Sequence, residues 1–136
     1  DASQAADGAE QIYLEMQQKS NHFSTFIPPS VYTYKHLMAV HAHAGRPHRV
    51  LELFDEMQER GLKPTQTHYL IALGACSSHP HLPLSINRAV DIYRAMRERG
   101  GYRLDTRTLH ELVEMFTMHG REDLASRVRS ERSMVP

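Results

Sequence analysis

The 136-residue sequence contains no Trp, a single Cys and no net charge. One Cys excludes a disulfide framework within the chain and a zinc site built only from Cys ligands. Sixteen basic residues balance sixteen acidic ones, which argues against a protein held on nucleic acid mainly by bulk positive charge. No apolar run approaches the ~20 residues that a membrane-spanning helix needs. The chain begins at Asp1 rather than Met and shows no secretory signal, which indicates a processed or partial chain.

The sequence also lacks the motifs of common enzymes. It has no P-loop, no Gly-rich dinucleotide motif and no Gly-x-Ser-x-Gly elbow, so we expect no enzymatic activity and no small-molecule substrate. His41 and His43 are two residues apart and would point to different faces of a helix, and His79 and His81 lie in a Pro-containing loop. No carboxylate cluster or paired Cys accompanies them, so neither a metal site nor a cofactor is predicted.

What the sequence does have is an internal repeat. Segments 9–19, 50–60 and 89–99 align without gaps, with an apolar, an aromatic and a Met residue at fixed offsets and a cation at the end. Leu53, Phe54 and Met57 show the pattern, because their spacing of three and four places them on one face of a helix. We expect the Met to fill the core, and Gly61 and Gly100 to end their helices with positive φ.

A second kind of segment precedes each later copy, at 31–41, 66–76 and 106–116. Its apolar residues recur at intervals of three, four and seven, which also predicts a helix. Thr33, Thr67 and Thr106 are candidates for the N-terminal caps of these helices. Cys76 falls on the apolar stripe and is expected to be a small buried residue, and His41 a hydrogen-bonded core or interface residue.

The repeating unit is therefore helix, turn, helix and loop, with a period near 35 residues. A period of this length with paired helices predicts a helical solenoid, in which each pair buries its apolar face against its neighbours. We expect one solenoid domain divided into a leading second helix and loop (1–30), two full repeats (31–65 and 66–105, the latter with insertions) and a C-terminal partial repeat or cap (106–136).

The residues of 31–65 resemble the pentatricopeptide repeat over its full length. The segment Leu51-Glu-Leu-Phe-Asp-Glu-Met57-Gln-Glu-Arg-Gly61-Leu-Lys-Pro64 carries the resemblance, because it matches many positions at once. The resemblance implies an all-α fold, a right-handed α-solenoid of stacked antiparallel helix pairs. It also implies a protein of mitochondria or chloroplasts, and we expect the mitochondrial matrix side. Tetratricopeptide repeats are the nearest alternative, but they favour a Trp that this chain lacks.

The resemblance further implies single-stranded RNA as partner, with two side chains of each repeat on one base. Carried onto this sequence, the pairs are Lys35 with Thr65 and Leu70 with Asp105, while Ser30 and His110 belong to the incomplete units. The residue that sandwiches a base falls on Tyr32, Thr67 or Arg107. Arg103, Arg107 and Lys35 are candidates for phosphate contacts, and Tyr32 or His110 for stacking.

Three of these positions depart from the family pattern. Lys35 is long and only donates hydrogen bonds, Leu70 makes none, and His110 replaces a small polar residue. Base-by-base reading is therefore not expected. Three roles stay open. The first is RNA binding, and the second is a scaffold within a large ribonucleoprotein such as the mitochondrial ribosome, in contact with ribosomal RNA and neighbouring proteins. The alternative to both is an adaptor between proteins without RNA contact. Lys35, Arg103 and Arg107 on one stripe would favour RNA, and an apolar groove would favour a protein.

Overall fold

The computed structural model describes residues 1–20, 29–78 and 85–133, and these form seven α-helices and one π turn with no strand. The elements are α1 (Ala2–Ser20), α2 (Val31–His43), α3 (Pro47–Glu59), α4 (Gln66–Ser77), α5 (Ser85–Ala95), the π turn η1 (Met96–Gly100), α6 (Thr106–Met118) and α7 (Glu122–Ser133). No helix in these ranges is long and apolar enough to cross a bilayer.

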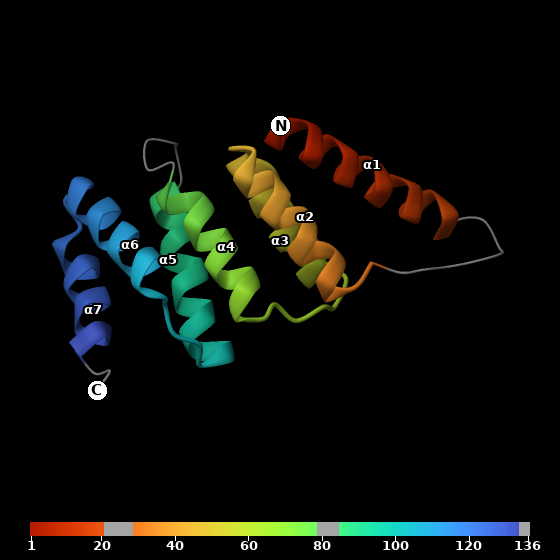
Figure 1. The fold of residues 1–136 in the computed structure, drawn as a ribbon. Coiled ribbons are helices and arrows are strands. Elements are labelled where there is room, and N and C mark those ends of the chain that lie inside the picture. The colour runs from red at the N-terminus through yellow and green to blue at the C-terminus, as the bar shows by residue number, and fades with distance from the viewer. Residues whose placement is uncertain (21–28, 79–84, 134–136) are drawn as a thin grey trace.

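The helices form pairs that stack in chain order. Helix α2 packs against α3, α4 against α5 and α6 against α7, and the first helices α2, α4 and α6 also pack in succession. The loops that join one pair to the next lie along one edge, the lower one in Figure 1, which we call the loop edge. The turns within pairs, at 44–46 and 119–121, lie along the opposite turn edge. The predicted all-α helical-repeat solenoid is confirmed.

One hydrophobic core runs through all the pairs. The repeated Met residues contribute to it as predicted in the two later copies, because Met57 and Met96 are 0% exposed. Met16, in α1, is only half-buried. Cys76 is buried in the same core, and burial raises the pKa of its thiol to about 11. This thiol is therefore a small core group, as its place on the apolar stripe predicts.

The residues that cap the first helices differ from those predicted. Thr33, Thr67 and Thr106 all lie inside their helices, and the N-caps are Ser30, Thr65 and Asp105. Each of the three has the extended backbone that an N-cap requires. Thr33 instead serves as the third helical residue of a capping box, in which its hydroxyl accepts from the Ser30 N–H at 3.1 Å.

The segment from Met96 to its glycine with positive φ contains one residue more than the corresponding segment from Met57, and the π turn absorbs it. The N–H of Tyr102 donates to the Met96 carbonyl at 3.3 Å, and the residue with positive φ is Gly101 (64°) rather than the predicted Gly100. In the shorter repeat Gly61 has this role, with φ of 81°, as predicted. π-Helices are rare, and most of those that occur are single-turn bulges of this kind within an α-helix.

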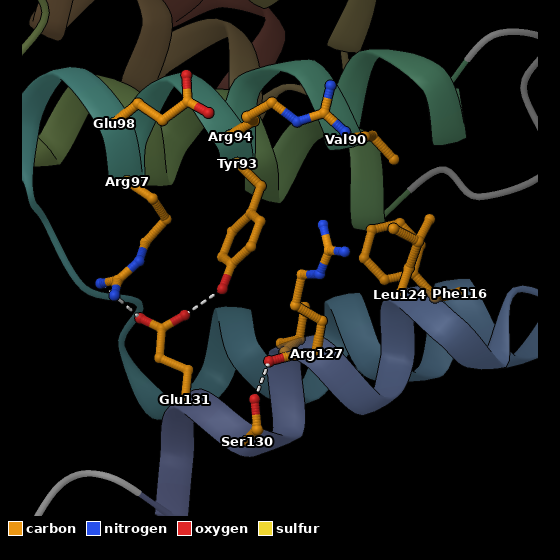
Figure 2. A pocket seen from close by; sticks show the side chains of 11 residues that line it. Val90, Tyr93, Arg94, Arg97, Glu98, Phe116, Leu124, Arg127, Ser130 and Glu131 are labelled. Carbon is orange, nitrogen blue, oxygen red and sulfur yellow. Dashed lines mark hydrogen bonds and ion pairs between the residues drawn. The ribbon is translucent and has the colours of Figure 1, made fainter.

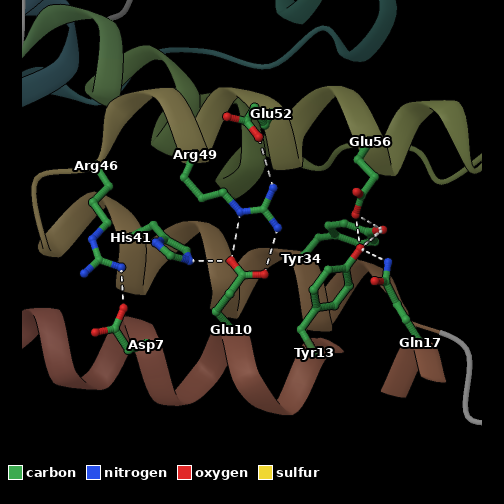
Figure 3. A network of polar contacts seen from close by, with 10 residues as sticks. All are labelled: Asp7, Glu10, Tyr13, Gln17, Tyr34, His41, Arg46, Arg49, Glu52 and Glu56. Carbon is green, nitrogen blue, oxygen red and sulfur yellow. Dashed lines mark hydrogen bonds and ion pairs between the residues drawn. The ribbon is translucent and has the colours of Figure 1, made fainter. Parts of the chain in front are cut away.

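Helix α1 packs against α2 and is held to α3 by a polar network (Figure 3). The Glu10 carboxylate accepts from Nε and Nη2 of Arg49, both at 2.8 Å, and lies 2.9 Å from Nε2 of His41. Asp7 pairs with Arg46 at 2.8 Å beside it. His41 is 2% exposed, so its predicted role as a hydrogen-bonded interface residue is confirmed.

A tyrosine–glutamate contact recurs between second helices. The Tyr13 hydroxyl of α1 donates to Glu56 of α3, and the Tyr93 hydroxyl of α5 donates to Glu131 of α7. In the aligned repeats the two tyrosines occupy one position and the two glutamates another. At the middle junction these positions hold Phe54 and Ala95. Loss of the hydroxyl and loss of the carboxylate thus coincide, so no buried polar group is left unpaired there.

Candidate nucleic-acid interface

The predicted contact residues of α2 lie at its loop-edge end. Tyr32, in the first turn, is 72% exposed, an unusual setting for a large aromatic side chain. Nζ of Lys35 lies 5.4 Å from the centroid of the Tyr32 ring, within the range of a cation–π contact. The two side chains therefore present a cation and an aromatic face to solvent together.

Thr65 and Asp105, which are predicted to close their repeats, are at the same time the N-caps of α4 and α6. Oδ1 of Asp105 accepts from the Thr108 N–H at 3.0 Å, which leaves the second carboxylate oxygen available for a ligand. The backbone N–H of Thr65 donates to Nδ1 of His68 at 3.0 Å. Both positions are exposed and are held in place by the helix start that they stabilise.

A groove of about 410 Å³ runs between the first helices α2, α4 and α6. We call it the first-helix groove. It brings together four of the predicted residues, Thr67, Leu70, Asp105 and Arg107. The remaining wall is mostly small or apolar and includes Ala39, Ala42, Ile71, Gly74 and Ala75. Nε of Arg107 pairs with Glu111 at 3.2 Å, so the only cation of this lining is partly neutralised.

The other predicted residues lie outside this groove. His110 is exposed and pairs with Glu114 at 3.2 Å. Arg103 is exposed on the loop before α6, where its carbonyl accepts from Nε2 of Gln66 at 3.0 Å. Lys35 and Arg103 do not line the groove with Arg107, so the three cations do not form one stripe along it.

Basic side chains without an acidic partner gather on the loop edge. Within the described side chains, those with no carboxylate at ion-pair distance are Lys35, Arg60, Lys63, Arg94, Arg99, Arg103 and Arg127. All but Arg94 and Arg127 belong to the loop edge. The turn edge is different, because Arg46 and Arg121 there pair with Asp7 and Asp123. Five of the seven unpaired cations among the described side chains therefore lie on one side of a chain with no net charge.

His68 supports this edge and was not among the predicted site residues. It is 1% exposed, and since its Nδ1 accepts from Thr65, its Nε2 carries the proton and donates to the Val31 carbonyl at 2.8 Å. Burial lowers the pKa of His68, which keeps the ring neutral. It thus joins the start of α4 to the start of α2. A Thr followed three residues later by a polar side chain is the one signal in the sequence that points to it.

A second hollow lies on the other side of the solenoid, between α5 with η1 and α7 (Figure 2). Its volume is about 310 Å³. Glu131 closes one end, because it accepts from the Tyr93 hydroxyl and pairs with Arg97 at 3.2 Å. Burial, and then the hydrogen bond to Glu131, raise the pKa of the Tyr93 hydroxyl. Arg94 of α5 and Arg127 of α7 also line this hollow, and Phe116 and Leu124 lie beside Arg127. None of the predicted contact residues lines this cleft.

Comparison with known proteins identifies the repeat. The model of the PPR repeat family matches residues 29–78, which contain α2, α3 and α4. The chain contains a repeat of the pentatricopeptide repeat family. The model spans the Gly61–Pro64 loop and the N-caps Ser30 and Thr65, so the family's pattern includes the loop edge of this pair.

Three pentatricopeptide repeat-containing proteins of Arabidopsis thaliana are similar to the chain. One is 30% identical over 107 residues, which are 79% of this chain and 18% of that protein. A second, named as chloroplastic, is 43% identical over 51 residues, 38% of this chain and 10% of its own length. A third, named as mitochondrial, is 29% identical over 89 residues, 65% of this chain and 18% of its own length. The chain thus spans less than a fifth of each of these relatives.

The double role of Asp105 in this pentatricopeptide repeat chain makes a prediction about stability. Asp105→Ala removes the cap and is expected to lower the free energy of unfolding by about 0.5–2 kcal/mol. Asp105→Asn keeps an oxygen that accepts from the Thr108 N–H, so stability should stay within about 0.5 kcal/mol of the unaltered chain. Urea denaturation of the three proteins measures both effects. Equal stability of the Ala and Asn variants would show that the cap contributes nothing.

Proposed function

We propose that this chain is part of an organellar protein that binds single-stranded RNA through the loop edge of a helical solenoid. In this proposal residues 31–65 and 66–105 are two pentatricopeptide repeats, 1–30 supplies the second helix of a preceding repeat, and 106–136 is a C-terminal partial repeat, all in one domain. The chain has no enzymatic role of its own. The match to the family supports the class of ligand, and the distribution of charge supports the place.

The observation that carries the proposal is the set of unpaired cations on the loop edge. Lys35, Arg60, Lys63, Arg99 and Arg103 lie there without carboxylate partners in the described part of the chain. Basic groups whose charge is not used within the protein are those that release counterions when they meet phosphates. The exposed Tyr32 ring lies on the same edge and adds a surface on which a base can stack.

Contact with the RNA backbone fits the side chains better than reading of individual bases. Leu70 and Lys35 occupy positions at which the family places base-reading groups, and neither offers an acceptor to a base edge. Asp105 and Thr65 are the positions with suitable chemistry, and both are fixed by their helix caps. We therefore propose binding with little sequence preference, in which Tyr32, Lys35, Thr65, Arg103, Asp105, Arg107 and His110 contribute contacts and Thr67 and Leu70 form the neighbouring groove wall.

A salt series with a random single-stranded RNA pool tests the proposal. The affinity of the unaltered chain is expected to fall as salt rises, with little enrichment of any motif. The slope of log affinity against log salt is negative, and the double variant Lys35→Gln/Arg103→Gln should reduce its magnitude by about 1 to 2. The matched control is Arg121→Gln/Arg129→Gln, which removes two exposed cations that already pair with acids elsewhere. No binding near physiological salt, or an equal effect of both double variants, would contradict the proposal.

The organelle and the assembly are part of the same proposal. The similar Arabidopsis proteins are named as chloroplastic in one case and mitochondrial in another, and we propose the mitochondrial matrix for this chain. A neutral surface with backbone contacts suits a subunit that scaffolds a larger ribonucleoprotein, such as the mitochondrial ribosome, among ribosomal RNA and neighbouring proteins. Fractionation of organelles on a density gradient, with the full-length protein followed by antibody, tests it. Sedimentation as a free monomer would contradict the scaffold role.

A protein partner in the first-helix groove is the second candidate. Its small and apolar lining favours this reading, since the one cation there, Arg107, already pairs with Glu111. A helix with an apolar face would fit between α2, α4 and α6. Salt-insensitive association of a protein with the groove, abolished by Ala75→Trp but not by changes on the loop edge, would support this role in place of RNA binding.

A further inference from the structure

A separate pocket opens on the loop edge between two successive inter-repeat loops. Its volume is about 540 Å³. The walls come from the end of α3, the loop 61–64, the start of α4 and the segment from η1 to Tyr102. Lys63 lines it from the loop 61–64 and Arg99 from η1, and Tyr69 and Tyr102 form its aromatic side. We call it the loop pocket. It shares no residue with the first-helix groove or with the cleft at α7.

The loop pocket contains cations and no acid. No Asp or Glu lines it, and neither Lys63 nor Arg99 has a carboxylate at ion-pair distance in the described part of the chain. The cleft at α7 has three basic groups, Arg94, Arg97 and Arg127, but holds Glu98 and Glu131 as well. Two uncompensated positive charges in one concave site attract an anion more strongly than either charge on a flat surface.

The aromatic side of the pocket is packed against the core. Tyr69 is 3% exposed and packs edge to face on Phe54, with ring centroids 5.6 Å apart. The Tyr102 ring lies 6.0 Å from the Tyr69 ring, tilted at 47°, and is half-buried. Tyr102 stands at the repeat position that Leu62 occupies in the preceding loop, so packing alone does not require an aromatic ring there. A flat ring next to two cations is suited to a ligand with both a planar and an anionic part.

We propose that the loop pocket receives one nucleotide of RNA, with a phosphate between Lys63 and Arg99 and its base against the Tyr102 ring. This inference rests on the proposed function and gives it a defined site. The volume lies within the range of small-ligand sites. Pro64, in the pocket wall, directly precedes Thr65, so a phosphate held here continues the path of the RNA along the loop edge. That continuity favours RNA over an acidic peptide. The carboxylate side chains of such a peptide also offer no planar ring to stack on Tyr102.

Oligouridylate binding in a salt series tests the pocket. Lys63→Gln/Arg99→Gln is expected to lower affinity by about 3- to 10-fold and the salt slope by about 1 to 2. Tyr102→Leu, which copies the preceding loop, should lower affinity at least about 5-fold and leave the slope unchanged, because stacking releases no counterions. The matched control is Arg94→Gln/Arg127→Gln, which removes two equally unpaired cations from the cleft at α7. Thermal melting checks that every variant folds.

The outcomes separate the pocket from the proposed function. If the unaltered chain binds RNA but the Lys63/Arg99 variant behaves like the Arg94/Arg127 control, the pocket is wrong and the loop-edge proposal stands. If the unaltered chain does not bind oligouridylate, both proposals fail. A Glu-rich peptide that competes with oligouridylate in the unaltered chain but not in the Lys63/Arg99 variant would assign the pocket to an acidic protein and overturn its assignment to RNA.

Discussion

Met57→Ala is expected to lower the free energy of unfolding by about 2–5 kcal/mol, the range for a buried Met truncated in a packed core. Met57 is 0% exposed, and it belongs to α3 in the middle of the stack, where its side chain is part of the continuous core. Ala favours a helix slightly more than Met does, so the loss comes from the cavity and not from the helix. The midpoint of thermal unfolding should fall by roughly 10 °C.

Met118→Ala is the matched control for this prediction. Met118 ends α6 and is 72% exposed, so the same change of side chain creates no cavity. Its effect should stay within about 0.5 kcal/mol. Urea denaturation followed by circular dichroism measures both variants. Similar losses for Met57→Ala and Met118→Ala would contradict the interpretation of the repeated Met as a core residue.

Glu10→Ala is expected to destabilise the chain by about 1–3 kcal/mol, because the side chains of Arg49 and His41 lose the carboxylate that they contact. The carboxylate of Glu10 receives two hydrogen bonds from Arg49 and one contact from His41. These contacts join α1 to both α2 and α3, so the variant should release α1 before the rest of the stack. Hydrogen exchange of α1 amides, together with urea denaturation, measures the effect.

Glu15→Ala on the same helix supplies the control. Glu15 is exposed, and its carboxylate accepts a long hydrogen bond from Nε2 of Gln11 at 3.5 Å. Because both substitutions change Glu to Ala within α1, the effect on helix propensity is the same and cancels in the comparison. Glu15→Ala should change stability by less than about 0.5 kcal/mol. An equal loss in the two variants would show that the network of Figure 3 contributes no stability.

The contribution of Glu10 should also depend on pH. The hydrogen bond from Arg49 lowers the pKa of Glu10 below its ordinary value of 4.5, so the unfolded chain binds a proton to this group at higher pH than the folded chain does. The stabilisation is therefore complete above the ordinary value and disappears as the pH falls through the lowered one. The difference in unfolding free energy between the unaltered chain and Glu10→Ala should shrink over that interval, and a constant difference would contradict the assignment.

The helix pairs could be predicted from the sequence because the signals are local. Leu53, Phe54 and Met57 face one way in any α-helix, and their repetition at a fixed period requires neighbouring pairs to bury them. The caps were placed wrongly for a local reason too. Thr33, Thr67 and Thr106 have suitable side chains, but the extended backbone of the preceding residues, Ser30, Thr65 and Asp105, decides which side chain meets the free N–H groups.

The candidate site was only partly predictable. Tyr32 and Lys35 are three residues apart on one helix, so their contact follows from helix geometry. The groove residues Thr67 and Arg107 are forty residues apart in sequence, and the repeat period alone brings them into one groove. Which cations remain unpaired was not predictable, because an ion pair such as that of Arg49 with Glu10 depends on where α1 packs.

The sequence by itself determined the fold class and the repeat, since these follow from side-chain spacing along the chain. The resemblance to the family came from the residues of one segment, 51–64. The tertiary structure alone decided that positive charge without acidic partners gathers on the loop edge and that Lys63 and Arg99 share a pocket. The physical reason is distance. Periodicity acts over a few residues within a helix, whereas charge compensation and cavities arise between side chains whose separation is set by how successive helix pairs stack.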